Sequence, residues 1–453
     1  MLTKKQVVLH ERPAFFENDW WCYMKAISKY VLVFLIVFFV LFAFLLGAAN
    51  IPDSAGQKRF EESGEYMAEH DTVTLVHEFA QSSRLDYYAD CVTLSIAYYL
   101  HGEHPLESAM WANYYGNNSN MMNQYLLETV QTDVEPDQEY LRYWHGNAAA
   151  MRYLHLFWNI KTIYMLHTVL MAALILILLW ILWKNGMRGE AVAFILAMVS
   201  AAVWIVPWCL EYTYAFLCML VAAIIGTLLA LRGKDYWIGS LFMITGMVTV
   251  FFDFLTTETL SLLIPLLLIL RIQRKEKSVK QLWLTAVKYC AMWLIGYLGM
   301  WVMKWALASV ILHIDVMPYV RGHIVERLNA YVASYYVTGN FYLDALVKNL
   351  LKIFPLEYGF FGKVLIFALV FGLFILPVAL GRINLREKIN GKRIALYAVL
   401  GFVPYVRYLV VTNHSFVHCF FTYRSQAATV LAICLIMLEL VQRTPRKAVA
   451  QDG

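Results

Sequence analysis

Residues 30–49 read YVLVFLIVFFVLFAFLLGAA, a stretch of twenty residues without a single charge. A helix needs about 20 mostly apolar residues to cross the hydrocarbon core of a bilayer. The stretch therefore predicts a membrane-spanning helix. Because it is longer than the apolar core of about 7–15 residues in a signal peptide, we expect it to remain as an uncleaved signal anchor.

Similar apolar runs recur along almost the whole sequence. The chain is 60% hydrophobic and 15% charged, whereas soluble domains carry about 25% charged residues. The sixth run is short and contains Pro265, and the seventh is long, so nine or eleven crossings stay open. We predict an all-α polytopic membrane protein with about ten transmembrane helices, at residues 30–49, 162–183, 191–209, 214–231, 236–254, 257–270, 282–312, 363–380, 394–412 and 425–440.

Lysine and arginine gather in alternate loops between these runs. Basic residues beside a span are retained in the cytoplasm. Both termini are therefore predicted to be cytoplasmic, with the chain in the plasma membrane. The basic positions are Lys25 and Lys29 before the first run and the clusters at 184–188, 232–234, 271–280, 382–393 and 443–447.

The same pattern divides the chain into parts. Between the first two runs the sequence is rich in Asp, Glu and aromatic residues, so we expect a folded, largely helical domain outside the membrane. The predicted parts are a cytoplasmic N-terminal segment (1–29), the first span (30–49), the extracytoplasmic domain (50–161), spans two to seven (162–312), a second extracytoplasmic segment (313–362), spans eight to ten (363–441) and a cytoplasmic tail (442–453).

Two acids in the outer domain are candidates for chemistry. Residues 83–101 read SRLDYYADCVTLSIAYYLH, where the apolar residues have helical spacing and Asp86 and Asp90 are four apart. Residues at i and i+4 have Cβ atoms about 5–6 Å apart on one helix face. Two such carboxylates could bind one divalent cation, Mg or Mn, or one could act as a general acid or base. The alternative is a helix cap, since acids favour the first helical turn.

Residues 140–146, YLRYWHG, combine a guanidinium, an imidazole and aromatic rings just before the second span. Arginine makes bidentate bonds to phosphate, and aromatic rings offer flat apolar faces to sugars. Arg142 and His145 are therefore candidates for phosphate binding, and Tyr143 and Trp144 for stacking on a sugar. The alternative is an aromatic belt at the membrane interface.

Polar residues also gather at the outer ends of the later spans. Glu211 is one of them, and Arg321 and His323 follow the seventh span. Arg407 lies about five residues inside the ninth span, which is roughly 8 Å deep at a rise of 1.5 Å per residue. An arginine at that depth normally faces protein or a water-filled cavity, with snorkelling to the interface as the alternative.

Residues 412–424, TNHSFVHCFFTYR, bring His414 and His418 four apart and place Arg424 at the start of the last span. Two such histidines could bind zinc, but a zinc protease needs Glu directly after the first, where Ser415 stands. We therefore favour a rim of His and Arg that binds phosphate or sugar hydroxyls. The seven cysteines are scattered, so neither a metal knuckle nor a disulfide framework is expected.

The whole layout resembles the GT-C glycosyltransferase superfamily of integral membrane enzymes. The resemblance rests on one span, a long outer loop rich in Asp and aromatics, many later spans, and the segments LDYYADC (85–91), RYWHG (142–146), FFDFLTTETLSLLIPLLL (251–268) and NHSFVHCFFTYR (413–424). It implies transfer of a sugar from a polyprenyl-phosphate donor to a cell-surface glycan or lipid acceptor, on the outer face of a bacterial membrane. The superfamily uses an acid in the first outer loop.

The resemblance implies roles for the candidate residues. Asp86 or Asp90 would deprotonate the acceptor, and Asp53, which lies closer behind the first span as the superfamily's acid usually does, is a second candidate. Tyr143 and Trp144 would line the donor sugar. The residues expected to bind the donor phosphate are Arg142, His145, Arg321, His323, Arg407, His414, His418 and Arg424.

Other functions fit a polar pocket in a membrane protein. A transporter or flippase of lipid-linked sugars would place its site near the midplane, often between internal repeats, and none is apparent here. A polysaccharide polymerase or ligase would use the same donor with another acceptor, and a non-catalytic receptor would only bind. The expected partners are membrane lipid, the polyprenyl-phosphate donor and the acceptor, with no nucleic acid and no cofactor beyond the divalent cation.

Overall fold

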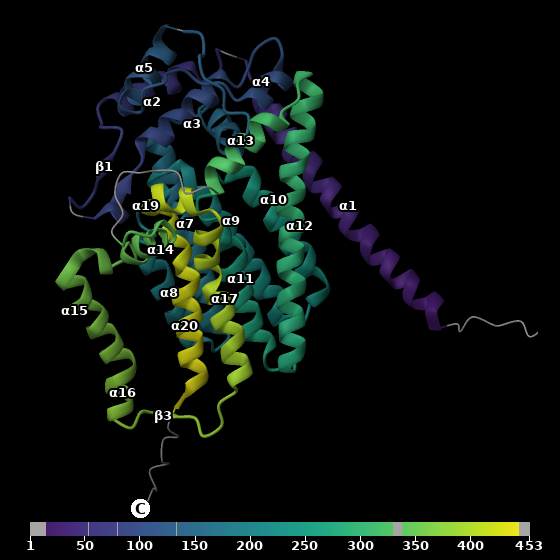
Figure 1. Cartoon of the computed structure of the whole chain (residues 1–453), viewed down its shortest axis with the longest axis vertical. Coiled ribbons are helices and arrows are strands. Elements are labelled where there is room, and N and C mark those ends of the chain that lie inside the picture. Colours follow the sequence, from purple (N-terminus) through teal and green to yellow (C-terminus); the bar gives the residue numbers. More distant parts are fainter. Residues whose placement is uncertain (1–14, 53, 79, 133, 329–337, 444–453) are drawn as a thin grey trace, which may run out of the picture.

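The computed structural model describes residues 15–52, 54–78, 80–132, 134–328 and 338–443 as a helical bundle with a domain at one end (Figure 1). The described residues do not include 1–14, in the predicted N-terminal cytoplasmic segment, or 444–453, in the predicted cytoplasmic tail. Asp53, a candidate acid, lies outside them as well.

Within the described residues, eight helical stretches are long and apolar enough to cross a membrane. They confirm a polytopic membrane protein made of helices. The stretches are Ile27–Ala49 of α1 (Phe15–Ala49), α7 (Ile160–Lys184), α9 (Leu210–Leu231), α10 (Asp235–Phe252), α12 (Val279–Leu312), Leu356–Ala379, α17 (Gly391–Val410) and Cys419–Leu440.

The two remaining predicted spans coincide with shorter helices, α8 (Arg188–Ser200) and α11 (Glu258–Gln273). At 1.5 Å per residue they extend about 20 and 24 Å, less than the roughly 30 Å of a hydrocarbon core. Every residue of α11 except Ile272 is buried. Because other helices cover it on all sides, α11 lies in the centre of the bundle. The count of ten crossings stays a prediction.

The outer domain lies over one end of the bundle (Figure 1). It is largely helical, with one short antiparallel pair of strands, β1 with β2. Its elements are α2 (Gln57–Ala68), β1 (Thr74–Leu75), η1 (Gln81–Ser83), β2 (Arg84–Leu85), α3 (Tyr87–Tyr99), α4 (Pro105–Trp111), η2 (Ser119–Met121), α5 (Met122–Thr132) and α6 (Gly146–Leu154).

Buried polar side chains join this domain to the bundle. Lys304 of α12 is fully buried and its Nζ donates to the carbonyl of Met110 at 3.1 Å. Arg424 donates to the carbonyl of Ser82 at 3.0 Å, and Trp144 donates to the carbonyl of Met300 at 2.9 Å. An unpaired polar group buried in a protein is costly, so these bonds fix the domain in one position on the helices.

The remaining elements complete the two ends of the bundle. Helices α13, α14 and α19 lie on the side of the outer domain, and β3 lies at the opposite end (Figure 1). These elements are η3 (Val206–Trp208), α13 (Met317–Leu328), α14 (Phe341–Leu351), η4 (Leu356–Tyr358), α15 (Gly359–Val370), the π-helix η5 (Phe371–Ile375), α16 (Leu376–Ala379), β3 (Ile383–Leu385), α18 (Thr412–Val417), α19 (Cys419–Thr422), η6 (Tyr423–Gln426), α20 (Ala427–Leu440) and β4 (Val441–Arg443).

The predicted cytoplasmic loops meet one another in the structure. Glu439 at the end of α20 accepts hydrogen bonds from Arg271, Arg274 and Arg393, and Arg271 Nε also lies 2.7 Å from Glu190 Oε1. Four loops that are far apart in the sequence therefore form one basic end of the bundle, as expected if all of them face the same side of a membrane.

Candidate functional site

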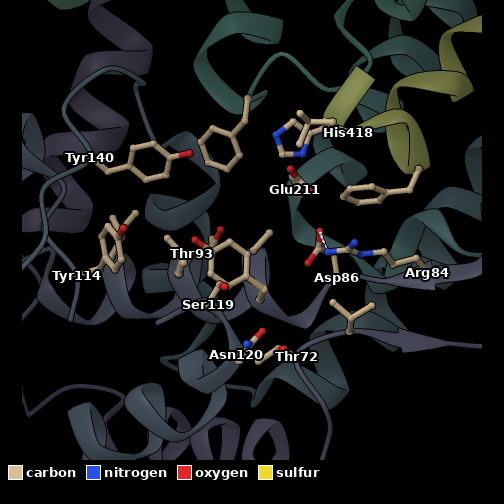
Figure 2. A pocket seen from close by; sticks show the side chains of 18 of the residues that line it. Thr72, Arg84, Asp86, Thr93, Tyr114, Ser119, Asn120, Tyr140, Glu211 and His418 are labelled. Atoms are coloured by element: carbon tan, nitrogen blue, oxygen red, sulfur yellow. Dashed lines mark hydrogen bonds and ion pairs between the residues drawn. The ribbon is translucent and has the colours of Figure 1, made fainter. Parts of the chain in front are cut away.

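A polar cavity of about 470 Å³ lies between the outer domain and the bundle. Its wall is made of hydroxyl, amide and charged groups together with aromatic rings, several of which Figure 2 shows pointing inward. The lining residues are Thr72, Val73, Arg84, Asp86, Tyr88, Ala89, Val92, Thr93, Ile96, Tyr114, Ser119, Asn120, Glu139, Tyr140, Arg142, Glu211, Phe254, Val417, His418 and Phe420.

Asp86 is the candidate acid that reaches this cavity. It occupies the N-cap position of α3 and is 3% exposed. Its Oδ2 lies 3.1 Å from Arg84 Nη2, while its Oδ1 has no hydrogen-bond partner among the described residues. Burial raises the pKa of Asp86 above the usual carboxyl value, although the nearby Arg84 guanidinium acts to lower it. The carboxylate thus offers one unused oxygen, and its raised pKa suits a general base.

Asp90 has a different environment, inside the protein. Its Oδ2 accepts a hydrogen bond from the Tyr164 hydroxyl at 2.5 Å, and its Oδ1 accepts one from the Leu210 backbone N–H at 2.8 Å. Burial raises the pKa of Asp90 well above the usual carboxyl value, and the Tyr164 bond opposes the rise. Asp90 therefore satisfies the N-terminus of α9 and does not line the cavity.

Glu211 is a second acid of the cavity, and it was not among the predicted site residues. It lies in the first turn of α9 and its Oε2 is buried without a hydrogen-bond partner among the described residues. The sequence signal was a carboxylate at the outer end of an apolar helix. Its position beside Asp86 (Figure 2) depends on the contact between α3 and α9, which no local pattern predicts.

The metal suggested by the sequence has few ligands here. The described residues contain no group of three or more His, Cys, Asp or Glu arranged to hold a metal ion. Asp86 and Glu211 bring two carboxylates with unused oxygens to one cavity. Because Mg²⁺ is commonly held by one or two carboxylates with substrate phosphates and water, these two residues would suffice only with a phosphate ligand present.

Arg142 borders two cavities at once. It lines the polar cavity and also an apolar groove of about 440 Å³ between α12 and α13. Its guanidinium lies 4.3 Å from the centre of the Tyr140 ring, and its Nη1 lies 3.1 Å from His323 Nδ1. The groove is lined by Arg142, Tyr143, Leu255, Tyr297, Leu298, Trp301, Val302, Trp305, Val320, His323, Ile324, Arg327, Leu328 and Val411.

The neighbours of Arg142 in the YLRYWHG segment lie in different surroundings. Tyr143 lines the apolar groove, and its hydroxyl lies 3.4 Å from the Phe254 carbonyl. Trp144 is fully buried and lines neither cavity. His145 is buried too, with its Nε2 2.7 Å from the Tyr140 carbonyl oxygen. Burial lowers the pKa of His145 to about 3, so it is uncharged at neutral pH.

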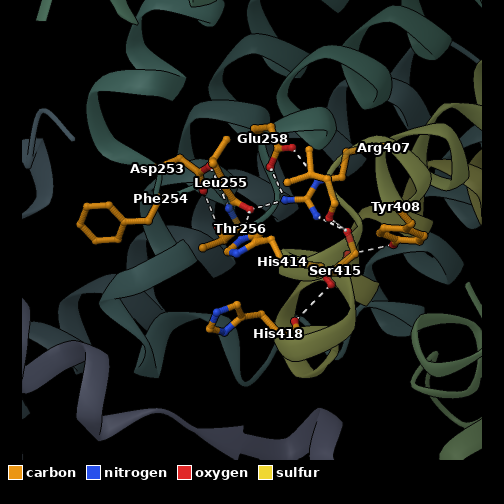
Figure 3. A network of polar contacts seen from close by, with 12 residues as sticks. Asp253, Phe254, Leu255, Thr256, Glu258, Arg407, Tyr408, His414, Ser415 and His418 are labelled. Atoms are coloured by element: carbon orange, nitrogen blue, oxygen red, sulfur yellow. Dashed lines mark hydrogen bonds and ion pairs between the residues drawn. The ribbon is translucent and has the colours of Figure 1, made fainter. Parts of the chain in front are cut away.

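Arg407 belongs to a buried network around the 253–258 turn (Figure 3). Its Nε donates to Glu258 Oε1 at 2.8 Å and its Nη1 donates to Ser415 Oγ at 2.8 Å. Its Nη2 donates to the carbonyl of Leu255, a residue with a φ of 65°. His414 also contacts this carbonyl, with its Nε2 2.9 Å away. Arg407 and His414 therefore hold the turn that carries Phe254 into the cavity wall.

The other predicted cations are distributed over different places. His418 lines the polar cavity, and burial lowers its pKa to about 3, so it serves as an uncharged imidazole. Arg424 is fully buried and donates to the carbonyls of Phe420 and Ser82. Arg321 lies exposed on α13. The structure thus brings Asp86, Arg142 and His418 together in one cavity.

The comparison with known proteins gives no relative. No family model matches this chain, and neither a curated protein nor a solved structure matches it.

Proposed function

We propose that this protein is a membrane glycosyltransferase that takes a sugar from a polyprenyl-phosphate donor on the side of the outer domain. The observation that carries the proposal is the position of Arg142 between a polar cavity and an apolar groove. A donor of this kind has a polar head, an anionic phosphate and a long hydrocarbon tail, in that order. Arg142 stands where the phosphate would lie if the head occupied the cavity and the tail the groove.

The groove suits an isoprenoid chain. Its lining is almost entirely apolar, with Trp301, Trp305 and Ile324 among its side chains, and Arg327 and His323 add polar groups beside Arg142. An isoprenoid chain that leaves the bilayer for this groove stays in apolar surroundings, so the groove can accept the tail while the phosphate supplies most of the binding energy. Arginine is the residue best suited to a phosphate, because its planar fork makes two parallel hydrogen bonds.

The cavity suits a sugar and an acceptor hydroxyl. The rings of Tyr114 and Tyr140 offer aromatic walls, and Thr72, Ser119 and Asn120 offer groups that pair with sugar hydroxyls. Figure 2 shows these side chains around the space next to Asp86.

The reaction uses Asp86 as the base. The acceptor oxygen attacks the anomeric carbon while the bond from that carbon to the phosphate oxygen breaks, and the proton of the acceptor passes to Asp86. The phosphate leaves with the bonding electrons, and Arg142 stabilises the charge that develops on it. A polymerase or ligase would use the same groups with a larger acceptor.

The test separates binding from chemistry. Purified protein is titrated with decaprenyl phosphate and with decaprenol, with thermal stabilisation as the readout. We expect stabilisation by the phosphate only, lost in Arg142→Gln and kept in the matched control Arg321→Gln, whose side chain lies exposed on α13. Equal responses of the two variants would end the assignment of Arg142.

Release of sugar from a pool of polyprenyl-phosphate sugars tests the base. General base catalysis contributes about 10²–10⁴-fold, so Asp86→Asn should lower turnover by that factor while donor binding persists. Glu107→Gln, on the exposed face of α4 in the same domain, is the control and should keep full turnover. Normal turnover by Asp86→Asn would refute the mechanism.

A further inference from the structure

The stretch Leu356–Ala379 stands apart from the rest of the bundle. It is long and apolar enough to span a membrane, yet among residues 359–379, all of which the structure describes, only Gly362 is buried. Figure 1 shows α15 and α16 running beside the bundle at a distance from α20. We call this stretch the outrigger helix.

An apolar crevice of about 300 Å³ separates the outrigger helix from α8 and α20. Ile366 and Leu369 line it from the outrigger helix, and Val199 and Val430 line it from the bundle. Its outer end is closed, since the Phe354 N–H donates to the Ser200 carbonyl at 3.1 Å. A volume of about 300 Å³ is too small for a helix, which is about 10 Å wide with its side chains. It is enough for part of a hydrocarbon chain.

The crevice adjoins a second cavity at the basic end of the bundle. This cavity has a volume of about 620 Å³, and Leu373 and Phe374 line both spaces. Three arginines line it, Arg188, Arg271 and Arg386, against one acid, Glu190.

The charges of this basic cavity are not balanced by the protein. Arg271 is paired with Glu190 and Glu439. Arg188 and Arg386 have no ion pair with any carboxylate of the described residues, and Arg386 uses its Nε to donate to the carbonyl of Val441. Two guanidinium groups at the mouth of an apolar crevice fit a ligand with an anionic head and an acyl tail.

We infer that an anionic glycerophospholipid binds here, with its phosphate at Arg188 and Arg386 and one acyl chain between the outrigger helix and the bundle. The site is at the opposite end of the molecule from the polar cavity, and it does not depend on the proposed function. The predicted orientation places it at the cytoplasmic leaflet, where anionic lipids are concentrated. The lipid would fill the crevice and hold the outrigger helix in place.

Native mass spectrometry of the full-length protein, delipidated and then given phosphatidylglycerol or phosphatidylcholine, tests the headgroup end. We expect one phosphatidylglycerol to be retained, at least tenfold more strongly than phosphatidylcholine. The double variant Arg188→Gln/Arg386→Gln should lose this preference. The matched control Arg232→Gln/Lys234→Gln, on an exposed basic turn at the same end, should keep it. Loss in both variants to the same extent would overturn the assignment, as would competition by inorganic phosphate alone.

A second pair of variants tests the acyl chain independently. Leu369→Trp fills the crevice and should abolish lipid retention, while Val364→Trp, on the same helix but outside the crevice lining, should not. A tryptophan fluorescence melt of each variant verifies that it is folded. Retention of phosphatidylglycerol by Leu369→Trp would refute the crevice as the binding place. If the wild type is a dimer, and Leu369→Trp disrupts the dimer but still retains the lipid, the crevice binds a second copy of the chain instead.

Discussion

Replacement of Arg407 by Met tests whether this arginine stabilises the fold or binds the proposed donor. Arg407 and Glu258 are each 6% exposed, so the substitution leaves a carboxylate buried without its cation. Removing one partner of a buried ion pair typically costs about 3–5 kcal/mol. Ser415 keeps its own hydrogen bond to the Val411 carbonyl, so it adds little to the loss. We expect Arg407→Met to lower the free energy of unfolding by about 3–5 kcal/mol.

The double variant Glu258→Gln/Arg407→Met gives the sharper result. A neutral amide in place of the carboxylate removes the buried charge, and the remaining loss is the buried amide at position 258 without its Arg407 partner, about 1–3 kcal/mol. The Leu255 carbonyl keeps its contact with His414 Nε2. The double variant should therefore be more stable than Arg407→Met alone. Contacting residues show such non-additive effects in double-mutant cycles.

Thermal unfolding followed by tryptophan fluorescence suits this chain, which has 14 Trp. The expected order of melting temperature is wild type, then the double variant, then Arg407→Met. Arg321→Met, on the exposed surface of α13, is the control and should melt like the wild type. If Arg407→Met melts like the wild type but no longer binds decaprenyl phosphate, Arg407 serves the donor, as the sequence predicted.

Two further acids give distinct predictions. Asp90→Ala should lower the free energy of unfolding by about 2–4 kcal/mol, because the Tyr164 hydroxyl and the Leu210 N–H both lose their acceptor. Asp90→Asn should keep most of the wild-type stability. Loss of sugar transfer in Asp90→Asn at an unchanged melting temperature would instead make Asp90 the base. Burial, followed by the charge of Glu258, raises the pKa of Asp253 to about 7, so the folded state holds this proton more tightly than the unfolded state. The stability that the Asp253 proton contributes is fully present below the ordinary carboxyl pKa of about 4 and is lost as pH rises through about 7. Melting temperatures measured between pH 4 and 8 should show this decline in the wild type but not in Asp253→Asn. Parallel pH profiles of the two proteins would contradict the prediction.

Apolar length predicted most of the long helices, because a helix needs about 20 mostly apolar residues to cross the hydrocarbon core. The same criterion cannot separate a span from a helix buried in the centre of a bundle. Residues 257–270 were predicted as a span, and α11 is a helix of 16 residues that is buried inside the bundle. Whether α11 crosses the membrane stays a prediction. The hydrophobic pattern of the sequence did not predict the β3–β4 pair, in which Ile383 lies opposite Arg443 and Leu385 opposite Val441. These two strands are far apart in the sequence and meet only through tertiary packing.

The candidate acids show where local spacing is insufficient. The prediction that Asp86 and Asp90 share a face assumed helical geometry at both positions. Asp86 is the N-cap residue, with φ −97° and ψ 71°, so its side chain leaves in another direction and reaches the cavity. Arg142 contacts His323, which is 181 residues away in the sequence. Neither the cavity nor the groove could be read from a single segment.

The hydrogen bonds between the outer domain and the bundle limit how a substrate can enter. Three buried hydrogen bonds, made by Lys304, Trp144 and Arg424, join the outer domain to the bundle. A hinge motion of the domain would break all of them at once. Each buried group left without its partner would cost about 1–3 kcal/mol, so such a hinge motion is unfavourable. We therefore expect the proposed donor to enter sideways from the bilayer, through the groove between α12 and α13. Ligand exchange would then require movement of α13 and not of the outer domain.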